Sequence, residues 1–370
     1  MRVYHLIKSF GRGGAETLLL SIFVARNNDQ VQFRFGYFLP WKRQIADELL
    51  AAGAQVDCFK ANGNLSILFK TFSIASILKN WNTDILHCHL PWAGLVGRLA
   101  GRISGIPVIY TEHNKQERYH WATRLINRIT FSWQQCAIAV SREVAMSIEQ
   151  NIRPKTPVHV VANGIDTRLF SRRDELRRAS RSANGIEENE LVVGLVAVFR
   201  KQKRLSLWLK VASLVKQRMD NVKFVLVGDG PCRTEVEEGI RLYSLSTSVQ
   251  LPGLKHDPRP YYECFDLLLM TSIFEGLPVA VLEAMAMQVP IVSTLAGGVG
   301  EVVRQEQDGF LLPVDASAEA LASACVLLLS DAERRAAFGL NARQRVIDHF
   351  SLEKMTAALE SIYRDTLAKA

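Results

Sequence analysis

Hydrophobic positions along the chain fall into short runs, and longer segments with helical spacing of apolar side chains lie between them. The short runs are β-branched or continuously apolar, which is typical of strands buried in a sheet. They predict strands at 3–7, 32–38, 55–59, 84–88, 107–111, 137–140, 158–162, 191–198, 222–227, 249–251, 266–270, 290–294 and 309–312. Segments of helix length, such as 15–25 and 205–218, separate them. This alternation predicts an α/β fold with parallel sheets built from βαβ units.

A charged segment at 171–190 interrupts the alternation. It combines arginine and acidic residues with the turn dipeptide Asn184-Gly185, a composition typical of connections. Because 370 residues suffice for two domains, we interpret 171–190 as a linker. It would join an N-terminal domain at 1–170 to a C-terminal domain at 191–350. A last helical segment within 351–370 could pack back onto the N-terminal domain.

The net charge of +8 comes from the N-terminal half, where residues 1–170 carry 20 Lys and Arg against 11 Asp and Glu. A basic half favours an acidic partner, such as membrane phospholipid, a lipid diphosphate or nucleic acid. An ordinary soluble surface explains the excess equally well. The sequence contains no recognised helix-turn-helix, zinc or base-stacking motif, so we expect no nucleic-acid partner.

The hydropathy of the chain indicates a protein without membrane spans. No apolar run reaches the ~18 residues that a spanning helix needs. The first residues read as a strand and a turn, without a separate signal segment. We therefore expect a cytoplasmic protein, which its basic half could bring to the inner face of the cytoplasmic membrane as a peripheral protein.

The six cysteines are scattered and form no Cys-x-x-Cys pair, so neither a disulfide framework nor a zinc site is predicted. Most of them lie in apolar or strand-like runs. Buried, unreactive thiols are therefore favoured over a catalytic thiol.

Two carboxylates, Glu275 and Glu283, are separated by seven residues. Glu275 follows a predicted strand, and Glu283 lies inside an apolar helical run that opens at Pro278. Proline is tolerated at the first helical position because the N–H that it lacks has no intrahelical acceptor there. A helix N-terminus beside the carboxyl end of a strand is where open α/β sheets bind phosphorylated ligands. The glycine turn Gly297-Gly298 follows the next predicted strand, and the two turns could converge on one ligand.

Three further turns follow predicted strands. The turn GRGGAE, with Gly13 and Gly14, would let backbone N–H groups approach a phosphate. It lacks the G-x-G-x-x-G spacing of a dinucleotide site, and a plain tight turn explains it equally well. A basic turn with Arg200 and Lys203 suits a diphosphate, although alone it would indicate only a solvated run of charges. Gly228 lies in a turn that we expect to shape the same edge of the sheet.

Histidines provide two candidate sites. His113 lies just past the end of a predicted strand, where site residues collect in open sheets. His87 and His89 alternate along a strand, so their side chains share one face and could ligate a metal. Because no acidic or sulfur side chain joins the two histidines on that face of the strand, a packed or cleft-lining role is favoured. The turn Asn163-Gly164 marks either a hinge or a site at the domain edge.

The segment 115–133 mixes basic and aromatic residues. Arg124 and Arg128 share a helical face, and the aromatic residues around them are Tyr119, Trp121, Phe131 and Trp133. A basic, aromatic helix can lie on a membrane surface. An ordinary half-buried helix has the same pattern, and we favour it slightly.

Taken together, these motifs resemble the glycosyltransferases of family 4. The matching segments are, in order, GRGGAE, DILHCHLPWAGLVGRLA, IPVIYTEHN, IAVSREV, ANGID, VFRKQKR, FVLVGDGP, FEGLPVAVLEAMA, GGVGE and DGFLLPV, and they cover nearly the whole chain. The pair of glutamates with the downstream glycine turn is the specific element. The resemblance implies the GT-B architecture, in which two Rossmann-like doubly wound parallel-sheet domains face each other across a cleft.

The resemblance also implies roles for individual residues. Glu275 matches the glutamate placed against the donor sugar, and Glu283 matches the one that hydrogen-bonds the ribose hydroxyls. Arg200 and Lys203 match the basic pair that neutralises the donor diphosphate, and His113 matches the histidine near the transferred sugar. The positions implied to bind substrate through backbone or loop contacts are Gly13, Gly14, Asn163, Gly228, Gly276, Leu277, Val279 and Ala280.

The chain departs from the family pattern at three positions. Ala162 stands where proline is common, Arg204 stands where glycine is common, and Pro278 stands where many members have a second glycine. Pro278 removes one backbone donor from the glutamate loop, which puts contacts from that position in doubt.

The activity implied by the resemblance is retaining transfer of a sugar from a nucleotide-diphosphate sugar to a glycan or lipid-linked glycan. The implied pathway is cell-surface polysaccharide biosynthesis, of the lipopolysaccharide or exopolysaccharide type. Because cations can stabilise the departing diphosphate, we expect no metal and no further cofactor. We expect closure of the domains across the linker to exclude water. Alternatives are a nucleotide-sugar epimerase or hydrolase on the same fold and a non-enzymatic GT-B protein. The sequence leaves the sugar, the base, the acceptor and the oligomeric state open.

Overall fold

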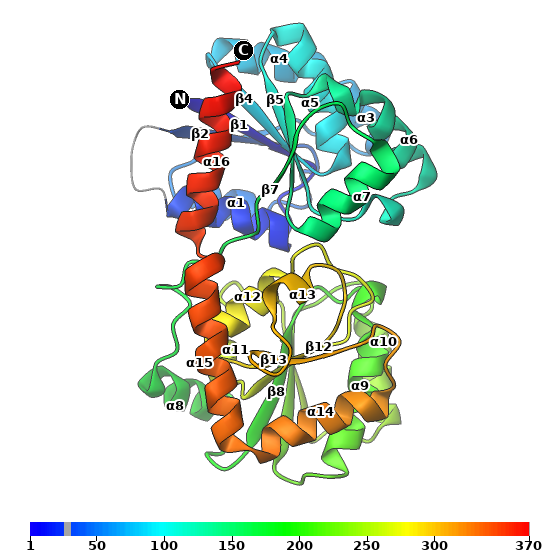
Figure 1. The fold of residues 1–370 in the computed structure, drawn as a ribbon, viewed down its shortest axis with the longest axis vertical. Coiled ribbons are helices and arrows are strands. Elements are labelled where there is room, and N and C mark those ends of the chain that lie inside the picture. The colour runs from blue at the N-terminus through cyan, green and yellow to red at the C-terminus, as the bar shows by residue number, and fades with distance from the viewer. Residues whose placement is uncertain (26–30, 370) are drawn as a thin grey trace. The chain divides into compact units, whose positions relative to one another are not determined.

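The chain forms two compact units in the computed structural model, which describes residues 1–25 and 31–369 (Figure 1). Unit 1 consists of Met1–Gly164 and Leu352–Ala370, and unit 2 consists of Ile165–Ser351. Residues 26–30 of the predicted N-terminal domain and residue 370 of the predicted last segment lie outside the described residues. Each unit has its own sheet and its own core.

Unit 1 is built on a seven-stranded parallel sheet. Its strands stand in the order β3-β2-β1-β4-β5-β6-β7. They are β1 (Arg2–Ile7), β2 (Gln32–Tyr37), β3 (Gln55–Cys58), β4 (Ile85–His89), β5 (Val108–Glu112), β6 (Cys136–Ala139) and β7 (Val158–Val160). Its central strands β1, β4 and β5 are almost entirely buried, which explains why apolar residues stand on both of their faces.

Helices cover both faces of this sheet. They are α1 (Gly14–Val24), α2 (Gln44–Ala51), α3 (Asn64–Leu68), α4 (Thr71–Asn80), α5 (Pro91–Ser104), α6 (Trp121–Thr130), α7 (Arg142–Ile152) and α16 (Leu352–Leu367), with the 3-10 turns η1 (Gln116–Arg118) and η2 (Phe131–Trp133). On one face, α1, α2 and the C-terminal helix α16 bury one apolar core against β1 and β2. On the other face, α4 and α6 flank α5, which lies on the central strands.

Unit 2 is built on a six-stranded parallel sheet in the order β10-β9-β8-β11-β12-β13. Its strands are β8 (Leu191–Val196), β9 (Val222–Val227), β10 (Val249–Gly253), β11 (Leu267–Met270), β12 (Ile291–Thr294) and β13 (Gly309–Leu312). Its helices are α8 (Asp174–Ala183), α9 (Leu205–Lys216), α10 (Arg233–Leu242), α11 (Arg259–Cys264), α12 (Val279–Ala286), α13 (Val299–Val302), α14 (Ala318–Ser330) and α15 (Ala332–His349), with the turn η3 (Lys201–Lys203).

The predicted strands agree closely with the observed ones. Each predicted strand overlaps one of β1 to β13, and the ranges 222–227 and 309–312 coincide with β9 and β13. The predicted helices at 15–25 and 205–218 correspond to α1 and α9. The last helix, α16, lies in unit 1 alongside α1 (Figure 1).

The predicted linker at 171–190 is wrong. Residues 174–183 form α8, which packs against α11 inside unit 2. Its charges have partners there, because Arg177 donates to Asp266 at 2.6 Å and the buried Arg181 contacts the same carboxylate at 3.4 Å. The chain therefore passes from unit 1 to unit 2 between Gly164 and Ile165, not at 171–190, and returns to unit 1 between Ser351 and Leu352.

Both sheets have a point where the strand order reverses. In unit 1 it lies between β1 and β4, and in unit 2 it lies between β8 and β11. Open α/β sheets bind ligands outside the carboxyl ends of the strands at such points. In the part of the chain that the structure describes, no helix is both long and apolar enough to cross a membrane.

Candidate functional site

In unit 2, the predicted basic turn and the first glutamate meet at the point of strand reversal. The turn η3 follows β8, and Glu275 follows the neighbouring strand β11. Lys203 Nζ lies 2.5 Å from Glu275 Oε1, and the Ser272 hydroxyl donates to the same oxygen at 2.6 Å. The side chains of Lys203 and Glu275 are 14% and 10% exposed. The pair is therefore fixed in place yet still accessible to a ligand.

Arg200 lies at the start of the same turn. Its side chain is exposed, and it forms no hydrogen bond or ion pair with the other described residues. Its guanidinium is available for an anion, whereas the Lys203 ammonium is shared with a carboxylate. Among the described residues of the turn, Arg200 and Lys201 are thus exposed cations without an ion pair, and Lys203 is a paired one.

The two glycine-containing turns of the glutamate motif pack against each other. Gly297 has a φ of +63°, and a Cβ there would lie 1.9 Å from the carbonyl oxygen of Glu275. The N–H of Gly298 donates to the carbonyl of Gly276 at 3.0 Å. The two turns therefore lie in contact, and only glycine fits at position 297; that they bind one ligand stays a prediction.

Glu283 is buried on α12 and accepts a hydrogen bond from the hydroxyl of Tyr262 at 2.7 Å. Burial raises the pKa of the Glu283 carboxyl to about 7, while the bond from Tyr262 opposes that rise. A carboxyl with this pKa changes its protonation state near neutral pH. Tyr262 comes from α11, far from Glu283 in the sequence.

The residues between the two glutamates form the entry to α12. Gly276 and Leu277 are buried, and Val279 and Ala280 open the helix half-buried. The helix begins at Val279 and not, as expected, at Pro278. Pro278 is its N-cap and has an extended conformation. The first N–H groups of a helix have no intrahelical acceptor and favour anions.

Gly228 has a structural reason to be glycine. It follows β9 with a φ of +137°, and a Cβ there would lie 1.9 Å from the carbonyl oxygen of Ala197. Ala197 directly follows β8, so this contact brings the β9 turn against the start of the basic turn. Gly228 therefore shapes the edge of the sheet, as the sequence predicts.

In unit 1, the predicted residues also lie at the carboxyl edge of the sheet. Gly13 is the N-cap of α1, and its carbonyl accepts the N–H of Thr17 at 2.9 Å. Gly14 is exposed at the first position of the helix. His113 follows β5 directly, and Asn163 lies past the end of β7.

The loop that carries His113 is anchored by a buried carboxylate, Glu112. Glu112 accepts the backbone N–H of His113 at 3.0 Å and hydrogen bonds from three side chains, those of Tyr110, Gln116 and Tyr119. Burial raises the pKa of Glu112, and these hydrogen bonds oppose the rise. Glu112 thereby holds the His113 backbone at the end of the strand.

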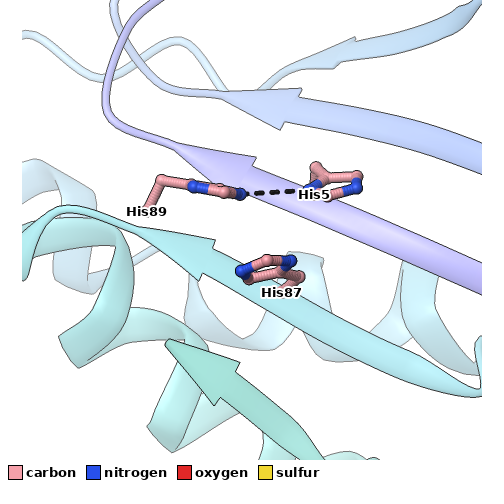
Figure 2. A group of neighbouring side chains, drawn as sticks. All are labelled: His5, His87 and His89. Carbon is pink, nitrogen blue, oxygen red and sulfur yellow. Dashed lines mark hydrogen bonds between the residues drawn. The ribbon is translucent and has the colours of Figure 1, made fainter. Parts of the chain in front are cut away.

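Three buried histidines gather behind His113. His5 on β1 and His87 and His89 on β4 each place a ring nitrogen within 4.8 Å of the others. His5 Nδ1 lies 3.0 Å from His89 Nε2 (Figure 2). The predicted shared face of His87 and His89 is confirmed, since their ring centroids are 4.3 Å apart. Among the described residues, this is the one group of three or more His, Cys, Asp or Glu side chains placed to share an ion.

A small cavity of about 20 Å³ joins these elements in unit 1. Its lining includes His89, His113 and Asn163, together with Ala15 from the first turn of α1. The structure therefore brings together the first glycine turn, His113 and Asn163 within unit 1. Within unit 2 it brings together Arg200, Lys203, both glutamates and the loop between them.

Two family descriptions match the chain, and together they span nearly all of it. Residues 2–169 match Glycosyltransferase Family 4, and residues 177–345 match Glycosyl transferases group 1. The chain therefore belongs to the family 4, group 1 glycosyltransferases. It is an enzyme, a glycosyltransferase with the GT-B architecture.

Relatives and solved structures agree with this assignment. The glycosyltransferase is 29% identical over 301 residues to N-acetyl-alpha-D-glucosaminyl L-malate synthase of Bacillus anthracis, covering 80% of this chain and 78% of the relative. It is 22% identical over 306 residues to an Escherichia coli UDP-Gal:alpha-D-GlcNAc-diphosphoundecaprenol alpha-1,3-galactosyltransferase, covering 79% and 78%. Its fold matches Anabaena Alr3699/HepE in complex with UDP and glucose with a TM-score of 0.87 and 21% identity, over 99% of this chain and 100% of the other.

The sequence analysis does not predict several residues of this glycosyltransferase that contact the candidate site. Tyr262, Ser272 and Glu112 each hold a predicted residue or its loop through a hydrogen bond. Glu112 stands directly before His113 in the sequence and could have been noticed as a buried acid. Tyr262 carries no local signal, because its contact with Glu283 spans 21 positions.

The thiols of the chain are largely shielded from solvent. Five of the six thiols are buried, and Cys58 is half-buried. Burial raises the pKa of the Cys88 thiol to about 12 and that of Cys136 to about 11. Such thiols stay protonated at neutral pH and are weak nucleophiles.

Proposed function

We propose that this glycosyltransferase moves a hexose from a uridine diphosphate hexose to a glycan or lipid-linked glycan acceptor in cell-surface polysaccharide biosynthesis. The observation that carries the proposal is the Lys203–Glu275 pair beside Arg200 at the strand reversal of unit 2. Uridine is chosen because a relative and a structural neighbour are named for UDP or a UDP-sugar. The lipid-linked acceptor is suggested by the diphosphoundecaprenol in the name of the Escherichia coli relative.

In this proposal, unit 2 binds the donor. Arg200 and Lys203 would neutralise the diphosphate together with the first N–H groups of α12, and Glu283 would accept hydrogen bonds from the ribose hydroxyls. Glu275 would face the donor sugar with the oxygen that Lys203 and Ser272 leave open. In unit 1, Gly13 and Gly14 would lie over the diphosphate, and His113 would contact the transferred sugar.

The proposed chemistry is a same-face displacement that retains the anomeric configuration, in keeping with the family. The bond from the anomeric carbon to the diphosphate oxygen breaks as the bond to the acceptor oxygen forms on the same face. The acceptor proton passes to the departing phosphate oxygen. Negative charge on the diphosphate grows at the transition state, so fixed cations stabilise it and can replace a divalent metal.

The test is a panel of uridine and guanosine diphosphate hexoses, screened by thermal shift with and without EDTA. One donor should stabilise the wild type equally in both conditions, and Glu283→Ala should abolish that stabilisation. Anomeric coupling in the product should match the donor. Stabilisation lost with EDTA would contradict metal independence, and an inverted product would contradict retention. Release of free sugar at the same rate without acceptor would indicate a hydrolase.

We also propose that unit 1 contacts a membrane surface through α6. The buried face of this helix carries polar residues, since Asn127 and Thr130 accept hydrogen bonds from Arg98 at 2.8 and 2.9 Å. Its apolar residues Trp121 and Ile129 are 70% and 62% exposed. A helix with an outward apolar face and exposed arginines suits the interface of an anionic bilayer.

A second exposed apolar group supports the membrane proposal. Leu65, Phe69 and Phe72, from α3 and the start of α4, are 75%, 82% and 74% exposed. The helices α3 and α6 both pack against α5, so both groups belong to the same half of unit 1. Exposed aromatic side chains at this density are unusual on a surface that stays in water.

Vesicle sedimentation tests this contact. The triple variant Trp121→Ser, Leu125→Ser and Ile129→Ser should bind anionic vesicles at least about tenfold more weakly than the wild type, because each side chain loses its burial in the bilayer. Leu242→Ser in unit 2, which replaces a side chain that is 76% exposed, is the matched control and should bind like the wild type. Equal binding by both variants would contradict a role for α6.

A further inference from the structure

A row of hydrogen-bonded imidazoles leads from the core of unit 1 to His113. His5 Nδ1 lies 3.0 Å from His89 Nε2 (Figure 2), and His89 Nδ1 lies 3.2 Å from His113 Nε2. His5 and His89 are 1% and 4% exposed, so water does not compete for the contact between them, whereas His113 is half-buried. The row starts on β1, crosses β4 and ends just past β5.

His87 lies beside the row without being part of it. Its Nδ1 is 2.7 Å from the hydroxyl of Tyr363, and its Nε2 is 2.6 Å from the hydroxyl of Thr111. Hydroxyl groups can donate or accept, so they adapt to either tautomer of His87. Because both of its nitrogens are engaged and the His5 to His89 contact is itself a hydrogen bond, the cluster is accounted for without a metal ion.

Each contact in the row needs one N–H and one bare nitrogen. All three rings are neutral at neutral pH, since burial lowers the pKa of His5 to about 3, that of His113 to about 4 and that of His89 well below its usual value. A neutral ring carries one proton, so the tautomer of one ring fixes that of the next. The row therefore has two states, in which every proton is on Nδ1 or every proton is on Nε2.

The inner end of the row distinguishes these two states. His5 Nε2 is buried and has no hydrogen-bond partner within the described structure. The rings of Phe33 and Phe35 stand beside His5, with centroids 5.2 and 5.5 Å away. A buried N–H without an acceptor is the rarer and more costly arrangement, so Nε2 is the bare nitrogen and Nδ1 carries the proton.

We propose that His5 and His89 are positioning residues that fix His113 as the Nδ1–H tautomer. His5 Nδ1–H donates to His89 Nε2, and His89 Nδ1–H donates to His113 Nε2. His113 then presents an N–H donor on the side away from the row, so it hydrogen-bonds an oxygen of a bound ligand instead of accepting a proton from it. The consequence for the sugar rests on the proposed role of His113 in the transfer, whereas the tautomer itself does not.

Nitrogen NMR of histidine-labelled protein reads the tautomer directly, without substrate. Long-range proton–nitrogen correlations at neutral pH should show His113 with a protonated Nδ1 and a bare Nε2. In His89→Leu, His113 should populate both tautomers, because the donor to its Nε2 is gone. His89→Asn should restore the single tautomer, since its amide N–H stands near the former Nδ1.

The matched control is His87→Leu, which removes an equally buried ring from the same strand. It should leave the His113 tautomer unchanged, and thermal unfolding would show whether each variant is folded. In transfer assays, His89→Leu should lower kcat by about tenfold with little change in KM, the loss expected for one hydrogen bond, and His89→Asn should recover most of it.

Three results would overturn the proposal. One is a wild-type His113 protonated at Nε2, and another is a single tautomer that persists in His89→Leu. The third is a stoichiometric metal ion retained through purification and lost in His5→Leu, because a metal would occupy the lone pairs that the row uses. If the tautomer is as expected but kcat does not respond to His89, the positioning stands and the proposed role of His113 in transfer fails.

Discussion

Lys203 and Glu275 neutralise each other at the ends of two neighbouring strands, and this pairing defines what each can do for a ligand. The Lys203 ammonium is held by Glu275 Oε1 at 2.5 Å, so little conformational freedom is left for it to lose when an anion arrives. A preorganised cation stabilises developing negative charge better than a mobile one.

The first prediction concerns Lys203. Lys203→Met keeps the length of the side chain and removes the charge, so turnover at saturating donor should fall about 10²–10³-fold. Lys201→Met is the matched control in the same turn, because Lys201 is exposed and forms no ion pair among the described residues. Initial rates of sugar transfer by the two variants and the wild type, at saturating donor, measure the difference. Similar rates for both variants would remove Lys203 from the proposed mechanism.

Glu283 gives a prediction in which stability and function oppose each other. Its pKa is raised to about 7 by burial, against about 4.5 in an unfolded chain. Between these values the unfolded chain releases the proton and the folded chain keeps it, so stability falls as pH rises toward 7. Above pH 7 the folded chain carries the cost of a buried carboxylate in full.

Glu283→Gln should therefore stabilise unit 2 above neutral pH. We expect ~1–3 kcal/mol near pH 8, which is a rise of a few degrees in Tm, and almost none near pH 4.5. Melting curves at the two pH values measure the difference. The same variant should bind nucleotide about tenfold more weakly, because the amide offers fewer acceptors to the ribose. A variant that is less stable than the wild type at pH 8 would show that the buried Glu283 carboxylate does not destabilise the folded unit.

At the scale of elements, ion pairs hold the helix α8 against the rest of unit 2 in a segment where the sequence predicts a linker. Arg181 is 6% exposed, and its guanidinium contacts the carbonyl of Cys264 as well as Asp266. Asp266 also accepts the N–H of Val192 at 2.9 Å, so one carboxylate ties α8 to the edge of β8. The charges that suggested a solvated linker are the contacts that dock the helix.

Asp266→Ala should destabilise unit 2 by ~3–5 kcal/mol, because it leaves the buried Arg181 without a counter-charge. Urea denaturation followed by fluorescence measures the loss. Glu175→Ala, an exposed position in the first turn of the same helix, should cost no more than ~1 kcal/mol. If Asp266→Ala unfolds like the wild type, α8 is not held by this carboxylate.

The sequence predicts the strands well and the docking of α8 not at all, for one physical reason. The central strand β11 is buried along its whole length, and its local sequence is accordingly a continuous apolar run. The partner of a charge, by contrast, is set by the tertiary fold. Asp266 lies 85 positions from Arg181, and no local pattern reports that distance.

The same distinction applies to the candidate site. Turns that follow strands could be predicted, because parallel strands collect them at one edge of the sheet. Arg200, Lys203 and Glu275 were found in this way. The partners that hold the side chains, such as Tyr262 and His5, come from other elements and needed the structure.

At the scale of the whole molecule, unit 1 is discontinuous in the sequence. The chain leaves it at Gly164, builds unit 2 and returns at Leu352 with α16. Four side chains of this helix, Leu352, Met355, Leu359 and Tyr363, are 1%, 5%, 8% and 1% exposed. They belong to the core that α1, β1 and β2 share. The last helix of the chain therefore completes the core of unit 1.

A chain that ends at Ser351 should therefore lose unit 1. Burial of one large apolar side chain contributes ~1.5–3 kcal/mol, so four of them amount to about the whole stability of a typical domain, ~5–15 kcal/mol. Calorimetry should show the transition of unit 2 and no cooperative transition of unit 1, since unit 2 keeps all of its own core. A chain that ends at Thr366 is the control and should melt like the full chain, because it keeps all four residues. An intact unit 1 transition in the shorter chain would mean that α16 covers this core without being needed to hold it together.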